Sequence, residues 1–83
     1  MNREVERARI GQRIAAVRKS FEWTDGHGIR RKGMTQGELA ERCGLNQSHI
    51  ARIEAGRYSV GFDTLQAIAE SLGMTVDFIK QQP

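Results

Sequence analysis

The chain has 83 residues, of which 39% are hydrophobic and 28% are charged, and its net charge is +3 at pH 7. This length allows one small domain with a modest core, and the single cysteine, Cys43, excludes an internal disulfide and a multi-cysteine zinc site. Because no apolar run approaches the roughly 18 residues of a membrane span and no secretory signal is recognisable, we expect a cytoplasmic protein.

The charge is unevenly distributed along the chain. Residues 1–33 carry nine Lys and Arg against four Asp and Glu, whereas residues 34–83 carry four against six. Clustered positive charge attracts polyanions such as nucleic acids but does not select a sequence. Many solvated helices carry similar charge, so this pattern alone does not indicate a function.

The first predicted helix begins after Asn2, a suitable N-cap, and its first turn contains Glu4 and Glu6. Apolar residues then recur at helical spacing on one face, namely Ile10, Ile14, Val17 and Phe21. Turn-forming residues follow in the segment 21–33, namely Thr24, Asp25, Gly26 and Gly28. We therefore predict a long loop over this segment rather than another helix.

The next segment, residues 35–56, has the pattern of two short helices joined by a tight turn. Thr35 and Glu38 can form a capping box at the start of the first helix, at about 35–43. Gly44 can adopt the positive φ that ends this helix. Helix, glycine turn and helix together form the helix-turn-helix pattern.

The second motif helix, at about 47–55, follows Asn46 as its N-cap and has Ile50 and Ile53 on its apolar side. The opposite face carries small and polar side chains, namely Gln47, Ser48, Ala51, Arg52 and Ala55. Gln can pair with adenine and Arg with guanine, each good pair contributing about 1–3 kcal/mol of discrimination. This face therefore suits the major groove of DNA.

Two further helices are predicted after the motif. The first begins after Gly61, a tolerable N-cap, and carries an apolar stripe of Phe62, Leu65, Ile68, Ala69 and Leu72 up to Gly73. Thr75 can cap a final short helix that contains Val76, Phe78 and Ile79. The pattern thus predicts five helices and no strand.

These residues resemble the phage repressor/Cro-like (XRE) family of helix-turn-helix proteins from about residue 10 to residue 79. The most specific motifs are Gln36-x-x-Leu39-Ala40, Cys43-Gly44-Leu45 and Ile50-Ala51-Arg52-Ile53-Glu54-Ala55-Gly56. The resemblance implies an all-α, compact five-helix, lambda-repressor-like DNA-binding domain that spans residues 1–83. The loop between its first and second helices is longer than is usual in the family.

The resemblance also implies a function and a set of contacts. We expect a sequence-specific transcriptional regulator, a repressor, that reads the major groove of double-stranded DNA. Expected base contacts are Gln47, Ser48 and Arg52, with Asn46 at the rim. Expected phosphate contacts are Gln36, Thr35, His49, Arg57, Tyr58 and Arg18. Arg18 is also expected to pair with Glu54, and packing beside Ile53 is the alternative role for His49.

The partners follow from the size of the domain. One domain reads only a few base pairs, so we expect a homodimer on a near-palindromic operator. Its dimer surface would be the last helix with Phe78, unless Phe78 only closes the core. The alternative function is an antitoxin that binds a toxin protein as well as its own operator, through the long loop or the last helix.

The long loop keeps three interpretations open. It could be an exposed insertion with Trp23 packed on the first helix, a surface for a partner protein, or an extra DNA contact. In the last case Arg30, Arg31 and Lys32 would reach the DNA backbone or the minor groove. We expect no enzyme activity, no cofactor and no metal, because catalytic groupings and companions for His27 and His49 are missing from the sequence.

Overall fold

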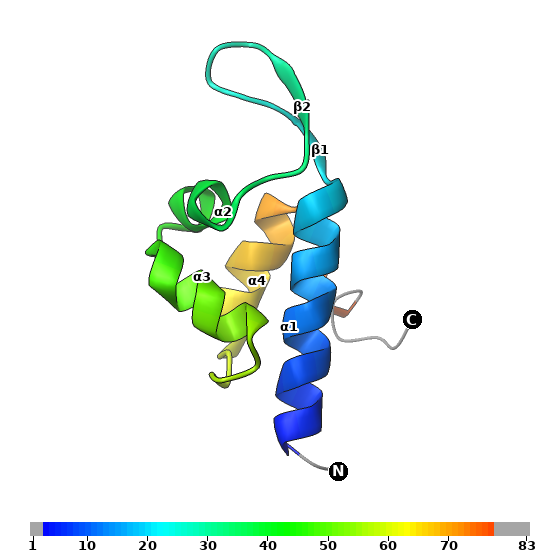
Figure 1. The fold of residues 1–83 in the computed structure, drawn as a ribbon, viewed down its shortest axis with the longest axis vertical. Coiled ribbons are helices and arrows are strands. Elements are labelled where there is room, and N and C mark those ends of the chain that lie inside the picture. Colours follow the sequence, from blue (N-terminus) through cyan, green and yellow to red (C-terminus); the bar gives the residue numbers. More distant parts are fainter. Residues whose placement is uncertain (1–2, 78–83) are drawn as a thin grey trace.

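A computed structural model of the protein describes residues 3–77, and this part of the chain forms four helices and a two-stranded antiparallel sheet (Figure 1). In chain order the elements are α1 (Arg3–Ser20), β1 (Glu22–Thr24), β2 (Arg30–Lys32), α2 (Gln36–Cys43), α3 (Gln47–Glu54) and α4 (Phe62–Ser71). The long α1 runs along one side of the molecule, and the three shorter helices lie beside it. None of the described helices is both long and apolar enough to cross a membrane.

The core lies between α1 and the three shorter helices. Its fully buried large side chains are Ile14, Leu39, Ile50, Ile53 and Ile68. They belong to the apolar stripes that helical spacing predicts, and burying each contributes about 1.5–3 kcal/mol. Phe62 is an exception. It is expected in the core, but it is the first residue of α4 and is 65% exposed. Its assignment to the stripe is wrong.

The ends of the motif helices are determined by side-chain and backbone caps. At α2 the Glu38 N–H donates to Thr35 Oγ1 over 3.0 Å, and the Thr35 N–H donates to Glu38 Oε1 over 2.8 Å. Gly44 ends α2 with φ of 73°, a conformation that L side chains disfavour. Asn46 Oδ1 then accepts the His49 N–H over 2.9 Å and caps α3. The predicted capping box and helix-turn-helix are confirmed.

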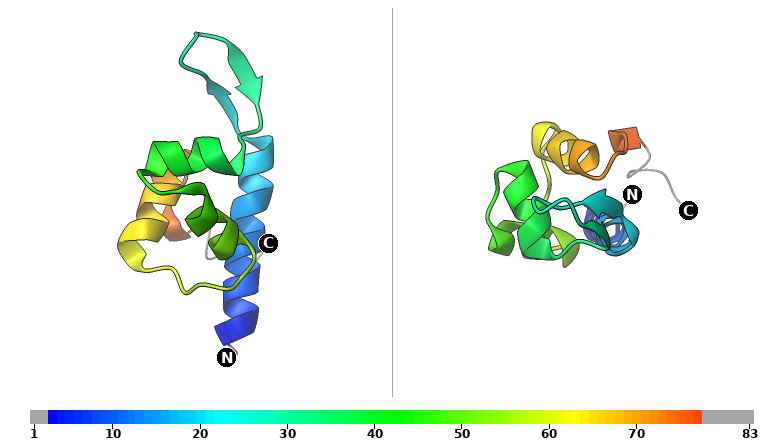
Figure 2. Two further views of the ribbon diagram at one scale, coloured as in Figure 1. Left: turned by 60° about the vertical axis from the view of Figure 1, so that its left-hand side comes forward. Right: turned by 90° about the horizontal axis from the view of Figure 1, so that it is seen from above.

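The segment 21–33 contains a β-hairpin, so the prediction of a loop without strands is wrong. β1 and β2 pair with Trp23 opposite Arg31, and their turn is closed by Asp25, whose Oδ1 accepts the N–H groups of His27 and Ile29. The Trp23 Nε1–H also donates to the Gly33 carbonyl over 2.9 Å. The backbone of the hairpin projects beyond the helices from the end of α1 (Figures 1 and 2), while the Trp23 side chain packs against the core.

The predicted fifth helix falls largely outside the described residues. Val76 and Asp77 are helical, whereas Phe78 and Ile79 are not described. The proposed N-cap of α1, Asn2, is also outside the described range. The described part of the chain therefore supports four helices and a hairpin, and five helices are not confirmed.

Gly11 determines how closely α1 approaches the end of α3. A Cβ atom at this position would lie 2.4 Å from the Ile53 carbonyl oxygen and 2.6 Å from that of Glu54. Both atoms belong to the backbone, which cannot move aside as a flexible side chain can. The absence of a side chain at Gly11 therefore allows α1 to support the last turn of α3 directly.

Candidate nucleic-acid interface

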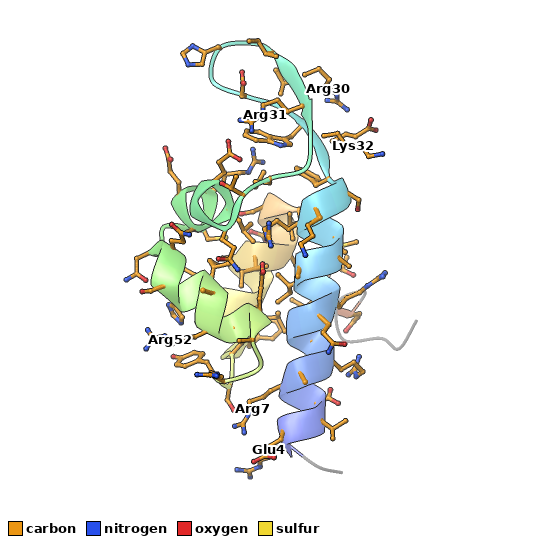
Figure 3. All side chains as sticks on the ribbon, viewed as in Figure 1. Glu4, Arg7, Arg30, Arg31, Lys32 and Arg52 are labelled. Carbon is orange, nitrogen blue, oxygen red and sulfur yellow. The ribbon has the colours of Figure 1, made fainter. Side chains whose placement is uncertain are left out.

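The outward face of α3 is polar and accessible. Ile50 and Ile53 are 0% and 1% exposed on the inner side, whereas Gln47 and Arg52 are exposed on the outer side. Figure 3 shows the Arg52 side chain directed away from the body of the molecule. The helix is thus anchored by one face and presents hydrogen-bonding side chains on the other, with Ala55 leaving room for close approach.

The start of α3 contains two further candidate residues that contact each other. The Ser48 hydroxyl donates to Asn46 Oδ1 over 2.8 Å, and the same oxygen caps the helix. Both side chains are exposed. Ser48 and Asn46 therefore form one polar unit beside Gln47, at the end of the helix that lies next to the turn.

A buried ion pair holds α3 against α1. Arg18 is 7% exposed, and its Nε and Nη2 atoms donate to the two oxygens of Glu54 over 2.7 and 2.8 Å. Its Nη1 atom donates to the Met34 carbonyl over 2.7 Å. The pair expected from the sequence is present. Each of the three guanidinium nitrogens donates one hydrogen bond inside the protein, so Arg18 positions the motif, and its contact with a phosphate stays a prediction.

Gln36 connects the same carboxylate to α2. Its Nε2 atom donates to Glu54 Oε1 over 3.0 Å, so Glu54 links α1, α2 and α3. Gln36 is the first residue of α2, where a helix has N–H groups without intrahelical partners. The capping box uses the Glu38 N–H, and the remaining N–H groups of the first turn are suited to an anion.

The loop after α3 brings other candidates to the opposite end of this helix. The rings of His49 and Tyr58 meet edge to face with centroids 4.8 Å apart, and Tyr58 is 42% exposed. Arg57 is also exposed. Arg7 of α1, which the sequence analysis did not select, donates from Nη1 to Ser59 Oγ over 3.1 Å. Arg7 and Ser59 are 52 positions apart in the sequence, so no local signal indicates this contact.

The hairpin separates the basic run into two sides. The Arg31 side chain faces α2, while Arg30 and Lys32 lie on the other side of the hairpin (Figure 3). Arg31 forms an ion pair with Glu38 and lies 5.0 Å from the centre of the Trp23 ring. The local signals for this hairpin are the strand propensity of Trp23 and Thr24 and the turn-forming residues that follow them, but each strand has only three residues.

Two ionisable groups near the interface have shifted pKa values. The hydrogen bond from the Thr35 backbone N–H, together with the Arg31 guanidinium, lowers the pKa of Glu38 below its ordinary value of 4.5. Burial raises the pKa of the Cys43 thiol, which lies near Ser71 of α4. Glu38 is therefore charged at neutral pH, while Cys43 stays protonated and packs as a small apolar residue. The described residues contain no cluster of three metal-ligating side chains.

The sequence is similar to known regulators. The Helix-turn-helix family matches residues 29–79. An immunity repressor protein of Bacillus phage phi105 is 39% identical over 70 residues, which cover 84% of this chain and 41% of the repressor. An uncharacterized HTH-type transcriptional regulator of Methanothermobacter thermautotrophicus is 46% identical over 41 residues, covering 49% of this chain and 59% of that protein. The chain thus spans about four to six tenths of the length of these relatives.

Solved structures show the same fold at low sequence identity. The restriction-modification controller protein C.AhdI from Aeromonas hydrophila superposes with a TM-score of 0.77 and 22% identity, covering 95% of this chain and 99% of the controller. The hypothetical transcription factor NHTF from Neisseria superposes with a TM-score of 0.75 and 21% identity, covering 99% and 80%. The similarity extends beyond the helix-turn-helix to the flanking helices.

Proposed function

Because this chain belongs to the Helix-turn-helix family, and within it to the phage repressor/Cro-like transcriptional regulators, we propose that it is a repressor that reads an operator with α3. The observation that carries the proposal is the exposed face of α3, whose position is determined by the buried Arg18–Glu54 pair. In this arrangement Gln47, Ser48 and Arg52 meet base edges in the major groove, with Asn46 at the rim.

Two sets of phosphate contacts flank α3 in this proposal. Gln36 and the first turn of α2 bind one backbone, where the N–H groups and the helix dipole favour an anion. Arg57 and Tyr58, in the loop after α3, bind a second stretch of backbone, together with His49, whose ring contacts Tyr58. Thr35 contributes through its cap, since its hydroxyl is engaged with the Glu38 N–H.

The repressor is proposed to act as a homodimer on a near-palindromic operator, because one α3 covers only a few base pairs. An exposed groove of about 330 Å³ beside α4 supports an association surface at the C-terminal side, and it is lined by Phe62, Gln66, Ala69, Glu70, Met74, Thr75 and Val76. Phe78, the residue expected there from the sequence, lies outside the described range. Sedimentation of the free protein and of its DNA complex tests this assembly.

A repressor is favoured over the antitoxin alternative by the similarity to a phage immunity repressor over 84% of this chain. The test is selection of bound duplexes from a random DNA pool at moderate salt. A site with two short, symmetric half-sites is expected. Recovery of no motif, with binding that disappears as salt rises, would leave only a sequence-independent interaction with the phosphate backbone.

Two variants distinguish the classes of contact. Arg52→Ala is expected to relax the preference at one base pair and to cost about 1–3 kcal/mol for the selected site. Gln36→Ala is expected to weaken binding to all sequences by similar factors, because a phosphate contact carries no sequence information. Titrations with the selected duplex and with single-base variants measure both. An Arg52→Ala protein with unchanged preference at every position would remove Arg52 from the base-reading set.

A further inference from the structure

The hairpin contacts α2 through the Arg31–Glu38 ion pair, at the proposed phosphate-binding end of the helix, and through the Trp23 ring beside Arg42. Arg31 of β2 reaches across to Glu38 with both of its terminal nitrogens. Beside this pair, a half-open cavity of about 540 Å³ separates the hairpin from α2, and Trp23, Asp25, His27, Glu41 and Arg42 are among its lining residues. The ion pair therefore bridges the hairpin and the first turn of α2.

Arg31 is held in place from the hairpin side. Its guanidinium lies 5.0 Å from the centre of the Trp23 ring, its cross-strand neighbour. Trp23 is fixed in turn by the bond from Nε1–H to the Gly33 carbonyl, and the Arg42 guanidinium lies 5.9 Å from its ring centre. A cation against an aromatic face is restricted in orientation, so Arg31 is already placed toward Glu38.

Glu38 has two functions that conflict at a DNA surface. Its carboxylate completes the capping box by accepting the Thr35 N–H, which stabilises the start of α2. The same carboxylate is a negative charge in the first turn of α2, two residues along the chain from Gln36, where a DNA phosphate is proposed to bind. Two negative charges at such a distance repel, and the N–H groups of the helix end offset this only in part.

We propose that Arg31 is a positioning residue for DNA binding, which neutralises Glu38 and holds the first turn of α2 in a geometry that accepts a phosphate. This inference rests on the proposed function, because it assumes that the end of α2 binds DNA. The hairpin then acts on affinity through α2, without a base contact of its own. Arg30 and Lys32, on the other side of the hairpin, have no part in this contact.

The test compares Arg31→Gln with Arg30→Gln in titrations of the selected duplex at low and at moderate salt. Both changes remove one positive charge from the same strand, so they alter the long-range attraction equally. Arg31→Gln is expected to weaken binding roughly threefold to tenfold, because Glu38 is then uncompensated. Arg30→Gln is expected to change affinity by less than about twofold, since an exposed and distant charge is screened by salt. Equal losses in the two variants would overturn the inference.

A second arm separates positioning from direct contact. Glu38→Gln removes the negative charge and keeps the capping box, since Gln serves at this position as well. In the Glu38→Gln protein, Arg31→Gln is expected to weaken binding no more than Arg30→Gln does. A loss that persists there would show that Arg31 touches DNA itself and would overturn the positioning role. Thermal unfolding of each variant, which should match the wild type closely, confirms that the proteins compared are folded.

Failure of the proposed function gives a different result from failure of this inference. If the wild-type chain recovers no preferred duplex, the major-groove function fails and the inference fails with it. If the wild type binds its site and Arg31→Gln binds equally well, only the inference fails. Arg31→Lys keeps the charge beside Glu38 but loses the two-nitrogen contact, so it should weaken binding less than Arg31→Gln does.

Discussion

The Arg18–Glu54 pair lies among the helices, whereas the Arg31–Glu38 pair lies between the hairpin and α2 at the surface. The side chains are 9% and 7% exposed in the first pair and 39% and 27% exposed in the second. A buried charge that loses its partner is costly, whereas an exposed pair is worth about 0–1 kcal/mol. The first pair should therefore control whether the motif is held together, and the second should matter mainly when a phosphate approaches.

The strongest test of this comparison is Arg18→Met, which leaves the Glu54 carboxylate buried without its cationic partner and still bonded to the Gln36 amide. We expect a loss of about 3–5 kcal/mol in the free energy of unfolding, measured by urea denaturation. Lys19→Met, at the exposed next position, is the matched control and should change stability by less than about 0.5 kcal/mol.

The double change Arg18→Met with Glu54→Leu should recover part of this loss, because neither charge is then left without a partner. A double variant as unstable as Arg18→Met alone would show that packing, rather than the charge of Glu54, determines the effect. A single Arg18→Met variant that loses less than about 1 kcal/mol would contradict the difference drawn between the two pairs.

The second prediction concerns the backbone contact that supports the buried pair. Gly11→Ala places a Cβ 2.4 Å from the Ile53 carbonyl oxygen, so α1 and α3 must separate. We expect a net loss of about 1–3 kcal/mol in the free energy of unfolding, despite the higher helix propensity of Ala. Gly26→Ala, where a Cβ meets nothing within 4 Å, is the control. Equal stability of the two variants in urea would show that the helices adjust without strain.

The contact at Gly11 is of a kind that the sequence does not predict. The helix-turn-helix could be predicted because its signals are local: a capping box at Thr35, a left-handed glycine at Gly44 and an N-cap at Asn46. The role of Gly11 depends on the backbone of residues more than 40 positions away, and no local pattern encodes such an approach. The Arg18–Glu54 pair was expected only through the family resemblance.

The prediction for residues 21–33, a loop without strands, is wrong for a different reason. Its turn residues were recognised, but strands of three residues each are too short to show a periodic pattern. Their pairing depends on contacts such as the Trp23 bond to Gly33 and the Arg31 pair with Glu38. The sequence therefore suggests that Arg30, Arg31 and Lys32 form one basic patch. In the hairpin, strand alternation places Arg31 on one side and its two neighbours on the other.

The smallest effect is expected from pH, and it comes from Glu38, the carboxylate of the exposed pair. The Thr35 N–H and Arg31 lower the pKa of Glu38 from its ordinary 4.5, so the unfolded chain binds the proton more readily than the folded one. The resulting stabilisation is complete above the ordinary pKa and is lost as pH falls through the lower, folded pKa. Glu38→Gln keeps the cap but does not titrate, and all other carboxylates are shared with the wild type. The difference in free energy of unfolding between the two proteins should therefore shrink as the pH is lowered below 4.5, and a difference that stays constant in acid would show that the charge of Glu38 does not contribute to stability.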